Sequence, residues 1–416
     1  MKVAIIGGGF TGLSCAFELL DKGVEVDLYE GEEKLGGLAG GFKPEEWLWS
    51  LEYFYHHVFT NDKEIIDLAK KVGWPVQIHS PRTTSFVGGK EKQLDSPLSL
   101  LKFSEISVWG RIRMGAGLAL LKIIPNGLFL EKYRVVDMLP KLIGVEGYGV
   151  IWEQLLKAKF GVYSETVNMA WFWTRVAKRT SKLGYFKKGF EGLAEKIGEK
   201  IIENGGKVVR KTKITKVEKK SDGGWRIGEK DYQGVVLTVP APVAEKILGI
   251  DLGFPKIEYL WGQTLVLELE ENLIDGYWMN ILEKDWPFLV VVEQTKMINK
   301  KNYGGKNVVY LGNYLQNDSK QLEMEKDRLL DLYEPFLKKI KRNFENKWVK
   351  HSFLFRKPYS QPVFPINYGK MIPKMKSDLE GLYLANMSMV YPFDRGTNYA
   401  VKMGKEVADR LIKDLK

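Results

Sequence analysis

Residues 2–30 have the sequence KVAIIGGGFTGLSCAFELLDKGVEVDLYE, in which an apolar run ends directly at three glycines. The run at residues 3–6 is typical of a strand that is buried on both faces of a parallel sheet. Beyond the glycines, apolar residues recur at the spacing of one helix face, and this pattern ends at Gly23. Residues 24–28 then alternate between apolar and polar side chains. The stretch therefore predicts a strand, a helix and a second strand.

The glycines at positions 7, 9 and 12 lie between the first strand and the helix, and an acidic residue ends the second strand. In a β-α-β unit this spacing is the fingerprint of a dinucleotide site. The glycines allow a tight turn, close approach to the pyrophosphate and close helix packing, while the helix N-terminus faces the phosphates and the acid accepts from ribose hydroxyls. The contacts predicted here are Gly7, Gly9, Phe10, Thr11, Gly12 and Glu30.

A second glycine-rich loop, EKLGGLAGG at residues 33–41, follows the second strand. It resembles the flavin loop of the FAD-dependent amine oxidase superfamily, which includes protoporphyrinogen oxidases, phytoene desaturases and UDP-galactopyranose mutases. Many members have an arginine before the paired glycines and another after them, where this chain has Lys34 and Leu38. The resemblance implies FAD, which we expect to be non-covalent because the only cysteine, Cys15, falls in the first helix. The contacts that it implies are Lys34, Gly36, Gly37, Leu38 and Ala39.

Residues 381–386 and 398–404 resemble the second flavin segment of these enzymes, in which a helix N-terminus faces the isoalloxazine and ribityl groups. This implies cofactor contacts at Asn398, Tyr399 and Ala400. Ile214 falls in a predicted strand, residues 214–217, whose backbone pairs with the adenine in relatives. The resemblance thus extends along essentially the whole chain, and it is closest to the protoporphyrinogen-oxidase-like group.

These motifs predict an α/β fold, with a Rossmann-like FAD-binding domain and an interwoven α+β substrate domain. No repeat, low-complexity tract or linker separates the two domains. We assign residues 1–75, 180–240 and 370–416 to a discontinuous FAD-binding domain. Residues 76–179 and 241–369 form the substrate or cap domain in this prediction.

The segment YFYHHVFTND at residues 53–62 resembles the flavin-proximal loop of UDP-galactopyranose mutases, where a histidine precedes Thr-Asn-Asp by four residues. His56 has this position, so the resemblance places it at the flavin as the best candidate for a general base. A structural histidine is the alternative for His56, and it is the favoured interpretation for His57. We expect no metal site, since adjacent residues of an extended chain point to opposite faces.

Two arginines adjoin aromatic residues: Arg175 follows Trp171-Phe172-Trp173-Thr174, and Arg395 directly precedes the predicted flavin helix. Arginine binds oxyanions through two parallel hydrogen bonds and stacks on rings, so this combination suits a phosphate or carboxylate with an apolar appendage. We therefore predict that both arginines bind an anionic small-molecule substrate. A solvated position on a helix is the alternative for Arg175.

The chain of 416 residues has a net charge of +11, and the excess is uneven. Residues 101–190 contain fifteen Lys and Arg against six acidic residues, whereas residues 1–60 contain four Lys against ten. This favours an anionic partner, with a solvated basic face as the alternative. No RNA- or DNA-binding motif is present, so we expect no nucleic-acid partner. No apolar run is long enough to span a bilayer, so we expect a cytoplasmic protein.

Residues 111–134 combine apolar stretches with basic residues at both ends, a pattern that suits a peripheral contact with the inner face of a membrane. The alternative is a lid or core element of the substrate domain.

For the function, the leading hypothesis is hydride transfer from an unidentified, phosphorylated or lipid-like substrate to FAD. A flavin-dependent sugar-nucleotide mutase is the second hypothesis, and a binding module that merely carries flavin is the third.

Overall fold

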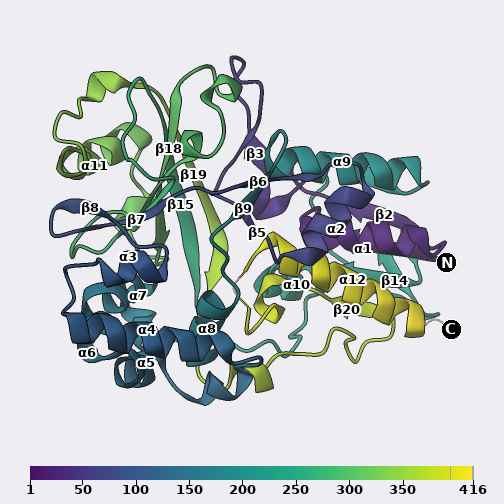
Figure 1. The fold of residues 1–416 in the computed structure, drawn as a ribbon. Helices are drawn as coiled ribbons and strands as arrows, with labels where there is room; N and C mark the ends of the chain where they lie inside the picture. Colours follow the sequence, from purple (N-terminus) through teal and green to yellow (C-terminus); the bar gives the residue numbers. More distant parts are fainter. Residues whose placement is uncertain (394, 415–416) are drawn as a thin grey trace.

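The structure is a computed structural model in which residues 1–393 and 395–414 are described (Figure 1). One lobe, on the right of Figure 1, contains both ends of the described chain and a parallel sheet. The other lobe contains a larger sheet, with a layer of helices at its lower end. The chain passes repeatedly between the two lobes, so they are interwoven as predicted.

The predicted β-α-β unit is confirmed, and it forms the centre of the five-stranded parallel sheet. The strands and the first helix are β1 (Lys2–Ile6), α1 (Phe10–Asp21), β2 (Glu25–Tyr29), β10 (Lys207–Val209), β14 (Gly234–Leu237) and β20 (Leu382–Leu384). Their order across the sheet is β10-β2-β1-β14-β20. In β1, β2, β14 and β20 both faces are mostly buried. One face packs against helices that include α1, and the other against α10 (Ala241–Leu248) and a small antiparallel sheet of β11 (Glu218–Lys219), β12 (Trp225–Ile227) and β13 (Lys230–Tyr232). The predicted α/β class with a Rossmann-like sheet is therefore confirmed.

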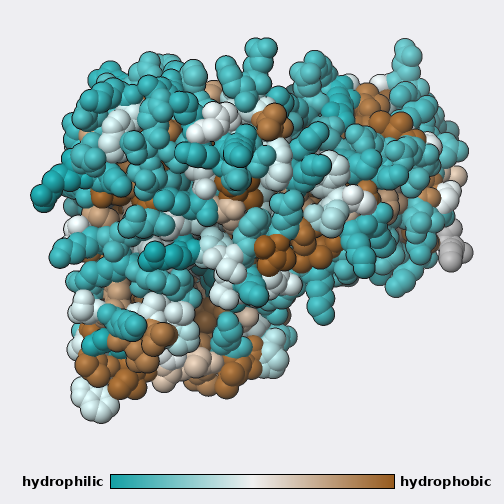
Figure 2. Space-filling model, turned by 45° about the horizontal axis from the view of Figure 1, so that its top comes forward, coloured by the Kyte–Doolittle hydropathy of each residue, from teal (hydrophilic) through white to brown (hydrophobic). Residues whose placement is uncertain are grey.

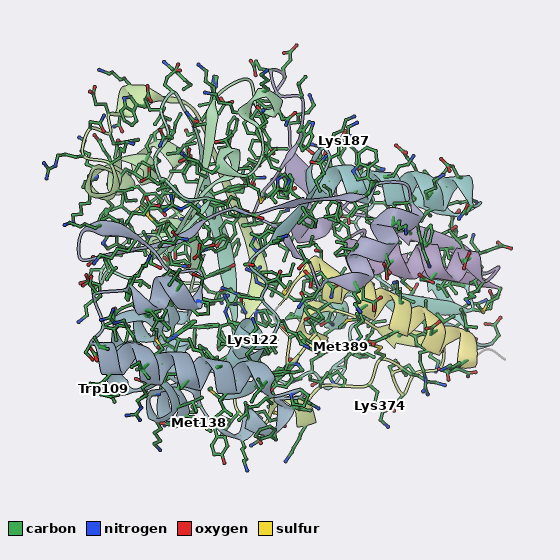
Figure 3. The ribbon with its side chains drawn as sticks, in the orientation of Figure 1. Trp109, Lys122, Met138, Lys187, Lys374 and Met389 are labelled. Carbon is green, nitrogen blue, oxygen red and sulfur yellow. The ribbon has the colours of Figure 1, made fainter. Side chains whose placement is uncertain are left out.

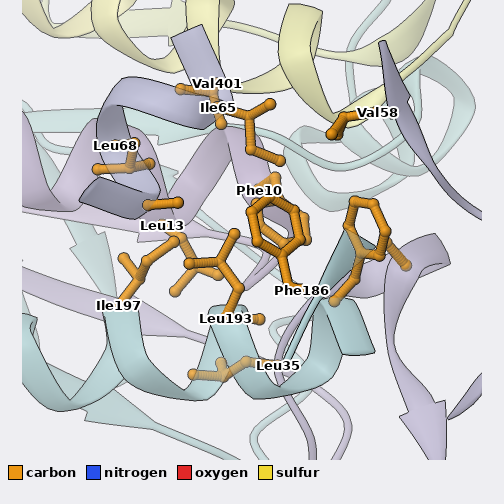
Figure 4. Close-up of a cluster of buried hydrophobic side chains, with 14 of the residues drawn as sticks. Phe10, Leu13, Leu35, Val58, Ile65, Leu68, Phe186, Leu193, Ile197 and Val401 are labelled. Carbon is orange, nitrogen blue, oxygen red and sulfur yellow. The ribbon is translucent and has the colours of Figure 1, made fainter. Parts of the chain in front are cut away.

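Helix α1 packs between two other helices, α9 (Gly189–Glu203) and α12 (Thr397–Asp414). Gly404 permits the close approach of α12, because a Cβ added there would lie 2.4 Å from the Thr11 carbonyl oxygen. Figure 4 shows the apolar cluster on this side of the sheet, where Phe10 and Leu13 of α1 meet Leu193 of α9. Helix α2 (Lys63–Lys71) adds Ile65 and Leu68 to the same cluster. This packing fixes the N-termini of α1 and α12 relative to each other.

The second lobe is built on a seven-stranded, mostly antiparallel sheet with the order β19-β15-β18-β17-β16-β7-β8. Its strands are β7 (Thr83–Val87), β8 (Lys90–Gln93), β15 (Tyr259–Leu269), β16 (Trp278–Ile281), β17 (Val290–Glu293), β18 (Asn307–Leu315) and β19 (Val349–Pro362). Helix α11 (Lys326–Ile340) packs on this lobe through Leu329, Tyr333 and Leu337. A small sheet of β5 (Val58–Phe59), β6 (Val76–His79) and β9 (Leu183–Phe186) lies where the lobes meet.

A helical layer forms the lower end of the second lobe in Figure 1. It contains α3 (Pro97–Leu101), α4 (Val108–Ile123), η2 (Leu128–Lys132), α5 (Val135–Ile143), α6 (Val145–Gly147), α7 (Glu153–Phe160) and α8 (Met169–Ala177). These helices enclose a core of their own, separate from that of the parallel sheet. Gly117 brings α4 close to α5, since a Cβ there would lie 2.9 Å from the Leu142 carbonyl oxygen.

One predicted element is wrong. Residues 214–217 do not form a strand, and strand structure appears only at β11 (Glu218–Lys219). The segment leaves the sheet after β10 and returns toward it beside Glu30, whose carbonyl oxygen accepts from the Thr212 N–H.

Among the described helices, none has both the length and the apolar composition that a bilayer crossing needs. The predicted domain boundaries stay predictions.

Candidate functional site

A single large cavity runs from the first glycine loop, past the C-terminal helix, to the helical layer. Its volume is about 1980 Å³, roughly twice the upper end of the usual range of about 300–1,000 Å³ for ligand pockets. It therefore has room for a dinucleotide and for a second molecule. Of the predicted site residues, all but Gly12 and Lys34 line it.

The two glycine loops meet at one end of the cavity. Gly9 and Gly36 form a parallel β-bridge, and the Gly36 N–H donates to the Gly8 carbonyl oxygen at 2.9 Å. A Cβ added to Gly9 would have no protein atom closer than 3.9 Å, so this position faces open space. A Cβ at Gly12, by contrast, would lie 1.9 Å from the Gly7 carbonyl oxygen. Gly12 therefore serves the packing of α1 on β1, and Gly9 serves the cavity.

Glu30 follows β2 and lines the cavity with its carboxylate held in place. Its Oε2 accepts from the Gly8 N–H at 2.7 Å, and its Oε1 accepts from the Glu32 N–H at 2.9 Å. Each carboxylate oxygen has lone pairs left for a ribose hydroxyl. Ile214 also lines the cavity, although it is not in a strand.

In the second loop, residues 36–39 line the cavity and include the short helix η1 (Gly37–Ala39). Gly36 has a φ of 109° and Gly37 a φ of 59°, values that favour glycine. Lys34 lies outside the lining, and its ammonium pairs with the Glu191 carboxylate at 3.0 Å. Lys34 is therefore paired within the protein, and its contact with the cofactor stays a prediction.

The N-terminus of α12 also faces the cavity, through Asn398, Tyr399 and Ala400. The Asn398 Oδ1 accepts from the backbone N–H groups of Glu64 and Ile65 at 3.0 and 3.3 Å, so this side chain ties α2 to α12. Asn386, just after β20, lines the cavity as well. Its buried Nδ2 has no hydrogen-bond partner among the described residues. An unpartnered donor here, together with the open space at Gly9, fits a dinucleotide that supplies the missing acceptor.

His56 lines the cavity in a fixed tautomer. Its Nδ1 lies 2.6 Å from the Phe54 carbonyl oxygen, which can only accept, so Nδ1 carries the proton and Nε2 is an acceptor. Burial, together with the nearby charge of Arg395, lowers the pKa of His56 to about 4. His56 is therefore neutral at pH 7. Burial likewise lowers the pKa of His57 to about 3.

Three cations and two aromatic rings alternate along the substrate end of the cavity. The Arg175 guanidinium lies 4.8 Å from the centroid of Trp171, and the Lys159 ammonium lies 5.3 Å from the same ring. Lys159 also lies 4.9 Å from the centroid of Tyr314, and Arg395 lies 4.8 Å from it. All five side chains line the cavity. We call this set the cation–ring row.

Arg395 stays charged at neutral pH. Burial lowers the pKa of Arg395 to about 10, with a further contribution from the charge of Arg175. The Arg395 Nε–H donates to the Gln361 Oε1 at 3.0 Å, which fixes the guanidinium against Tyr314. The sequence analysis proposed Arg175 and Arg395 as site residues, but not Lys159. The sequence signal that could have pointed to Lys159 is its position among Leu155, Leu156 and Phe160, on the apolar side of a helix.

No cluster of three potential metal-ligating side chains occurs among the residues that the structure describes.

Glu52 is a second residue that the sequence analysis missed. It is 1% exposed, lies beside the site, and accepts from the Tyr185 hydroxyl at 2.7 Å and from the Phe190 N–H at 2.6 Å. The contacts of all these residues with a bound cofactor or substrate stay predictions.

Comparison with known proteins supports a flavin site. The family model described as flavin containing amine oxidoreductase matches residues 10–412. This match confirms the predicted resemblance and a flavin cofactor. Among curated proteins, the zeta-carotene desaturase of Zea mays is 35% identical over 155 residues, which are 33% of this chain and 27% of that protein. The chain thus aligns with about a quarter of that relative's length.

Solved structures share the fold over nearly the whole chain. A protoporphyrinogen oxidase-like protein from Exiguobacterium sp. 255-15 superposes with a TM-score of 0.77 at 16% identity, covering 99% of both chains. A reduced UDP-galactopyranose mutase superposes with a TM-score of 0.74 at 16% identity, covering 100% of this chain and 96% of that one. Identities this low show the fold alone.

Proposed function

The chain belongs to the flavin-containing amine oxidoreductase family, and on this premise we propose that it is an FAD-dependent oxidoreductase. Its substrate in this proposal is an amphipathic molecule with an anionic group and an apolar part. The cation–ring row carries the proposal, because it puts three positive charges and two ring faces in the wall of one cavity.

FAD specifically, held without a covalent bond, is part of the proposal. The paired glycine loops, Glu30 and Asn386, whose Nδ2 has no partner among the described residues, line one cavity, and this supports a bound dinucleotide. Cys15 is the only cysteine in the sequence and is fully buried in α1, where burial raises the pKa of its thiol. It is therefore unsuited to attack a flavin ring.

The row suits an anionic group for a physical reason. Arginine binds phosphate or carboxylate oxygens through two parallel N–H donors, and the rings beneath the guanidinium groups fix the direction of these donors. The Trp171 Nε1 is buried without a partner among the described residues, so it adds an unused donor to the same wall. Leu118, Leu155 and Phe172 line the neighbouring part of the cavity and suit an apolar chain. The relative named for desaturation of zeta-carotene supports an apolar substrate.

FAD supplies the redox chemistry: when bound, it accepts the hydride from the substrate. The chain's own residues orient the substrate and accept the proton that the substrate loses together with the hydride. Because the Nδ1–H of His56 is committed to Phe54, a proton from the substrate can be held only at Nε2. The low pKa of His56 makes it a weak base that releases this proton readily.

Two measurements test the proposal. Denatured protein should release intact FAD into a filtrate, identified by mass spectrometry; a colourless protein that binds NADH and cannot be reconstituted with FAD would overturn it. Next, the reconstituted protein is mixed anaerobically with a polyisoprenyl diphosphate and with the matching neutral alcohol. We expect the flavin absorbance to bleach at a lower concentration of the diphosphate. Equal responses to both compounds would exclude a role for the anionic group.

The sugar-nucleotide mutase remains a second candidate because of the loop at residues 53–62. His56 and Asp62 both line the cavity, and burial raises the pKa of Asp62 to about 6. In this alternative the cation–ring row would hold a diphosphate bridge. Conversion of UDP-galactopyranose by the reduced but not by the oxidised protein, with no net consumption of reductant, would favour it over the oxidoreductase.

A further inference from the structure

The outer side of the helical layer exposes many large apolar side chains. On α4, Trp109 is 80% exposed and Ile123 76%, with Ile112 and Leu120 between them on the same face of the helix. Neighbouring elements extend this surface. We call it the apolar face; its other members are Leu98, Leu101, Val108, Leu128, Phe129, Tyr133 and Val145. Figure 2 shows brown side chains gathered over the helical layer at the lower left.

Ordinary packing does not explain this face. The opposite side of α4 already has its partners, since Met114, Gly117 and Leu121 are buried in the layer. The four exposed residues on α4 share one helix face, with the exposed Ala116 in the turn between Ile112 and Leu120, which is the pattern of a helix with a second apolar environment. A concentration of exposed apolar residues of this kind marks an interaction site in a folded protein.

Basic residues surround the apolar face. From α3 to α6, residues 97–147 contain seven Lys and Arg against four acidic residues. All four acids are engaged within the protein. Glu105 pairs with Lys92, and Asp137 pairs with Arg134. Glu131 is buried against Tyr391, and Glu146 accepts from Ser107. The cations are Lys102, Arg111, Arg113, Lys122, Lys132, Arg134 and Lys141.

We infer that the apolar face docks on an anionic lipid bilayer, with α4 lying in the plane of the interface. Its apolar side chains enter the acyl boundary, and its cations contact the headgroups. Trp109 and Tyr133 suit the headgroup level, because aromatic side chains with a polar atom concentrate there. Figure 3 labels Trp109 near the N-terminal end of α4, where its ring serves as an anchor, whereas Lys122 near the other end lines the cavity and donates to the Arg179 carbonyl oxygen.

The same charges argue against a second copy of the chain as the occupant. A two-fold interface would bring each cation close to cations of the partner, since both subunits use the same surface. Arg111 and Arg113 flank the exposed Ile112 in the sequence of α4, so such an interface would bring their charges with it. A bilayer with anionic headgroups neutralises these charges instead.

Vesicle flotation of the purified full-length protein tests this inference. We expect flotation with vesicles of phosphatidylcholine and phosphatidylglycerol, little with phosphatidylcholine alone, and a decline with added salt. The Trp109→Asp/Ile123→Asp double variant should lower the partition coefficient by at least about tenfold, since it places two carboxylates where apolar groups would be buried. An Arg111→Gln/Arg113→Gln variant should lower it less, and should flatten the salt dependence.

Ile202→Asp is the matched control, because Ile202 is 56% exposed on α9 in the other lobe. It should float like the wild-type protein. Flavin content and thermal melting check that each variant is folded; neither Trp109 nor Ile123 lines the cavity. Absence of flotation at low salt, or unchanged flotation of the double variant, would overturn the inference. So would a dimer in light scattering that the double variant abolishes, since the face would then serve self-association.

Discussion

Arg395 lies with its guanidinium carbon 4.8 Å from the ring centroid of Tyr314, which joins the segment before α12 to β18 of the seven-stranded sheet. The contact crosses from one lobe to the other at the substrate end of the cavity. The position of the arginine therefore depends on both lobes. It is the place where the cofactor-binding part of the chain and the substrate-binding part are directly coupled.

Removal of this arginine should weaken an anionic ligand without loss of flavin. We expect Arg395→Ala, and likewise Arg175→Ala, to raise the dissociation constant of inorganic diphosphate by about ten- to a hundredfold, the usual effect of losing a charge-assisted hydrogen bond. Quenching of flavin fluorescence measures the affinity. Arg342→Ala, at an exposed position after α11, is the control. Loss of flavin with unchanged diphosphate affinity would show that the arginine belongs to the cofactor site.

Gly9 and Gly12 should respond differently to valine. Gly9→Val meets no protein atom within 3.9 Å of its Cβ, so the apoprotein should fold and melt like the wild type. It should nevertheless retain no flavin, because the side chain occupies the space of the pyrophosphate. Gly12→Val should lose both flavin and cooperative melting, since its Cβ would lie 1.9 Å from a carbonyl oxygen. Visible spectra and thermal melting of apoprotein separate the two effects; normal flavin content in Gly9→Val would refute the placement.

Glu30→Gln should weaken FAD by about 1–2 kcal/mol, which corresponds to roughly a five- to thirtyfold higher dissociation constant. The amide keeps one acceptor oxygen, so it cannot receive both the Gly8 and the Glu32 N–H groups and a ribose hydroxyl as well. Titration of apoprotein with FAD measures the effect. Glu33→Gln, an exposed neighbour that pairs with Lys211, should bind FAD normally. Equal affinities of the two variants would contradict a ribose contact at Glu30.

Glu52 should make the protein less stable as the pH rises. Burial raises the pKa of this carboxyl from 4.5 to about 7, so the folded chain holds the proton more tightly than the unfolded chain does. The resulting stability is complete below about pH 4.5 and is lost as the pH rises through 7. Glu52→Gln should therefore exceed the wild type in unfolding free energy by about 1–3 kcal/mol at alkaline pH, and by much less in acid.

Chemical denaturation at a series of pH values measures this difference between Glu52→Gln and the wild type. His56 and His57 act in the opposite direction, because their lowered pKa values cost stability as the pH falls below 6.5. Both proteins contain them, so this contribution cancels in the difference. Glu229→Gln, at an exposed position, should show no such trend. A difference that does not change with pH would show that Glu52 stays ionised in the fold.

The first thirty residues were largely predictable because their signals are local. An apolar run, a glycine loop and a helical periodicity each act over a few residues, and the structure places β1, α1 and β2 accordingly. Ile214 illustrates the limit of such signals. Its segment, Ile-Thr-Lys-Val, contains three β-branched residues of the kind enriched in strands, but a strand exists only if another strand pairs with it, and none does at residues 214–217.

Lys159 and Glu52 were not predictable from local patterns. Lys159 belongs to the cation–ring row only because β18 and α8 bring Tyr314 and Trp171 to either side of it. Glu52 is buried by Tyr185, which lies more than a hundred residues later in the chain. Lys34 is the converse case: its position in the motif suggests a phosphate contact, yet α9 brings Glu191 within 3.0 Å of it.

The strand order β10-β2-β1-β14-β20 has a consequence for how the protein is made. In the register of this sheet, Ile5 pairs with Val236, and Val236 pairs with Tyr383. Closing loops of this length costs entropy before any pairing can offset it. After the glycine loops have left the ribosome, β20 and the start of α12 must still be synthesised before the cofactor site is complete. Flavin capture therefore waits until β20 and the start of α12 have been made, and the nascent chain keeps an unpaired β14 edge until then.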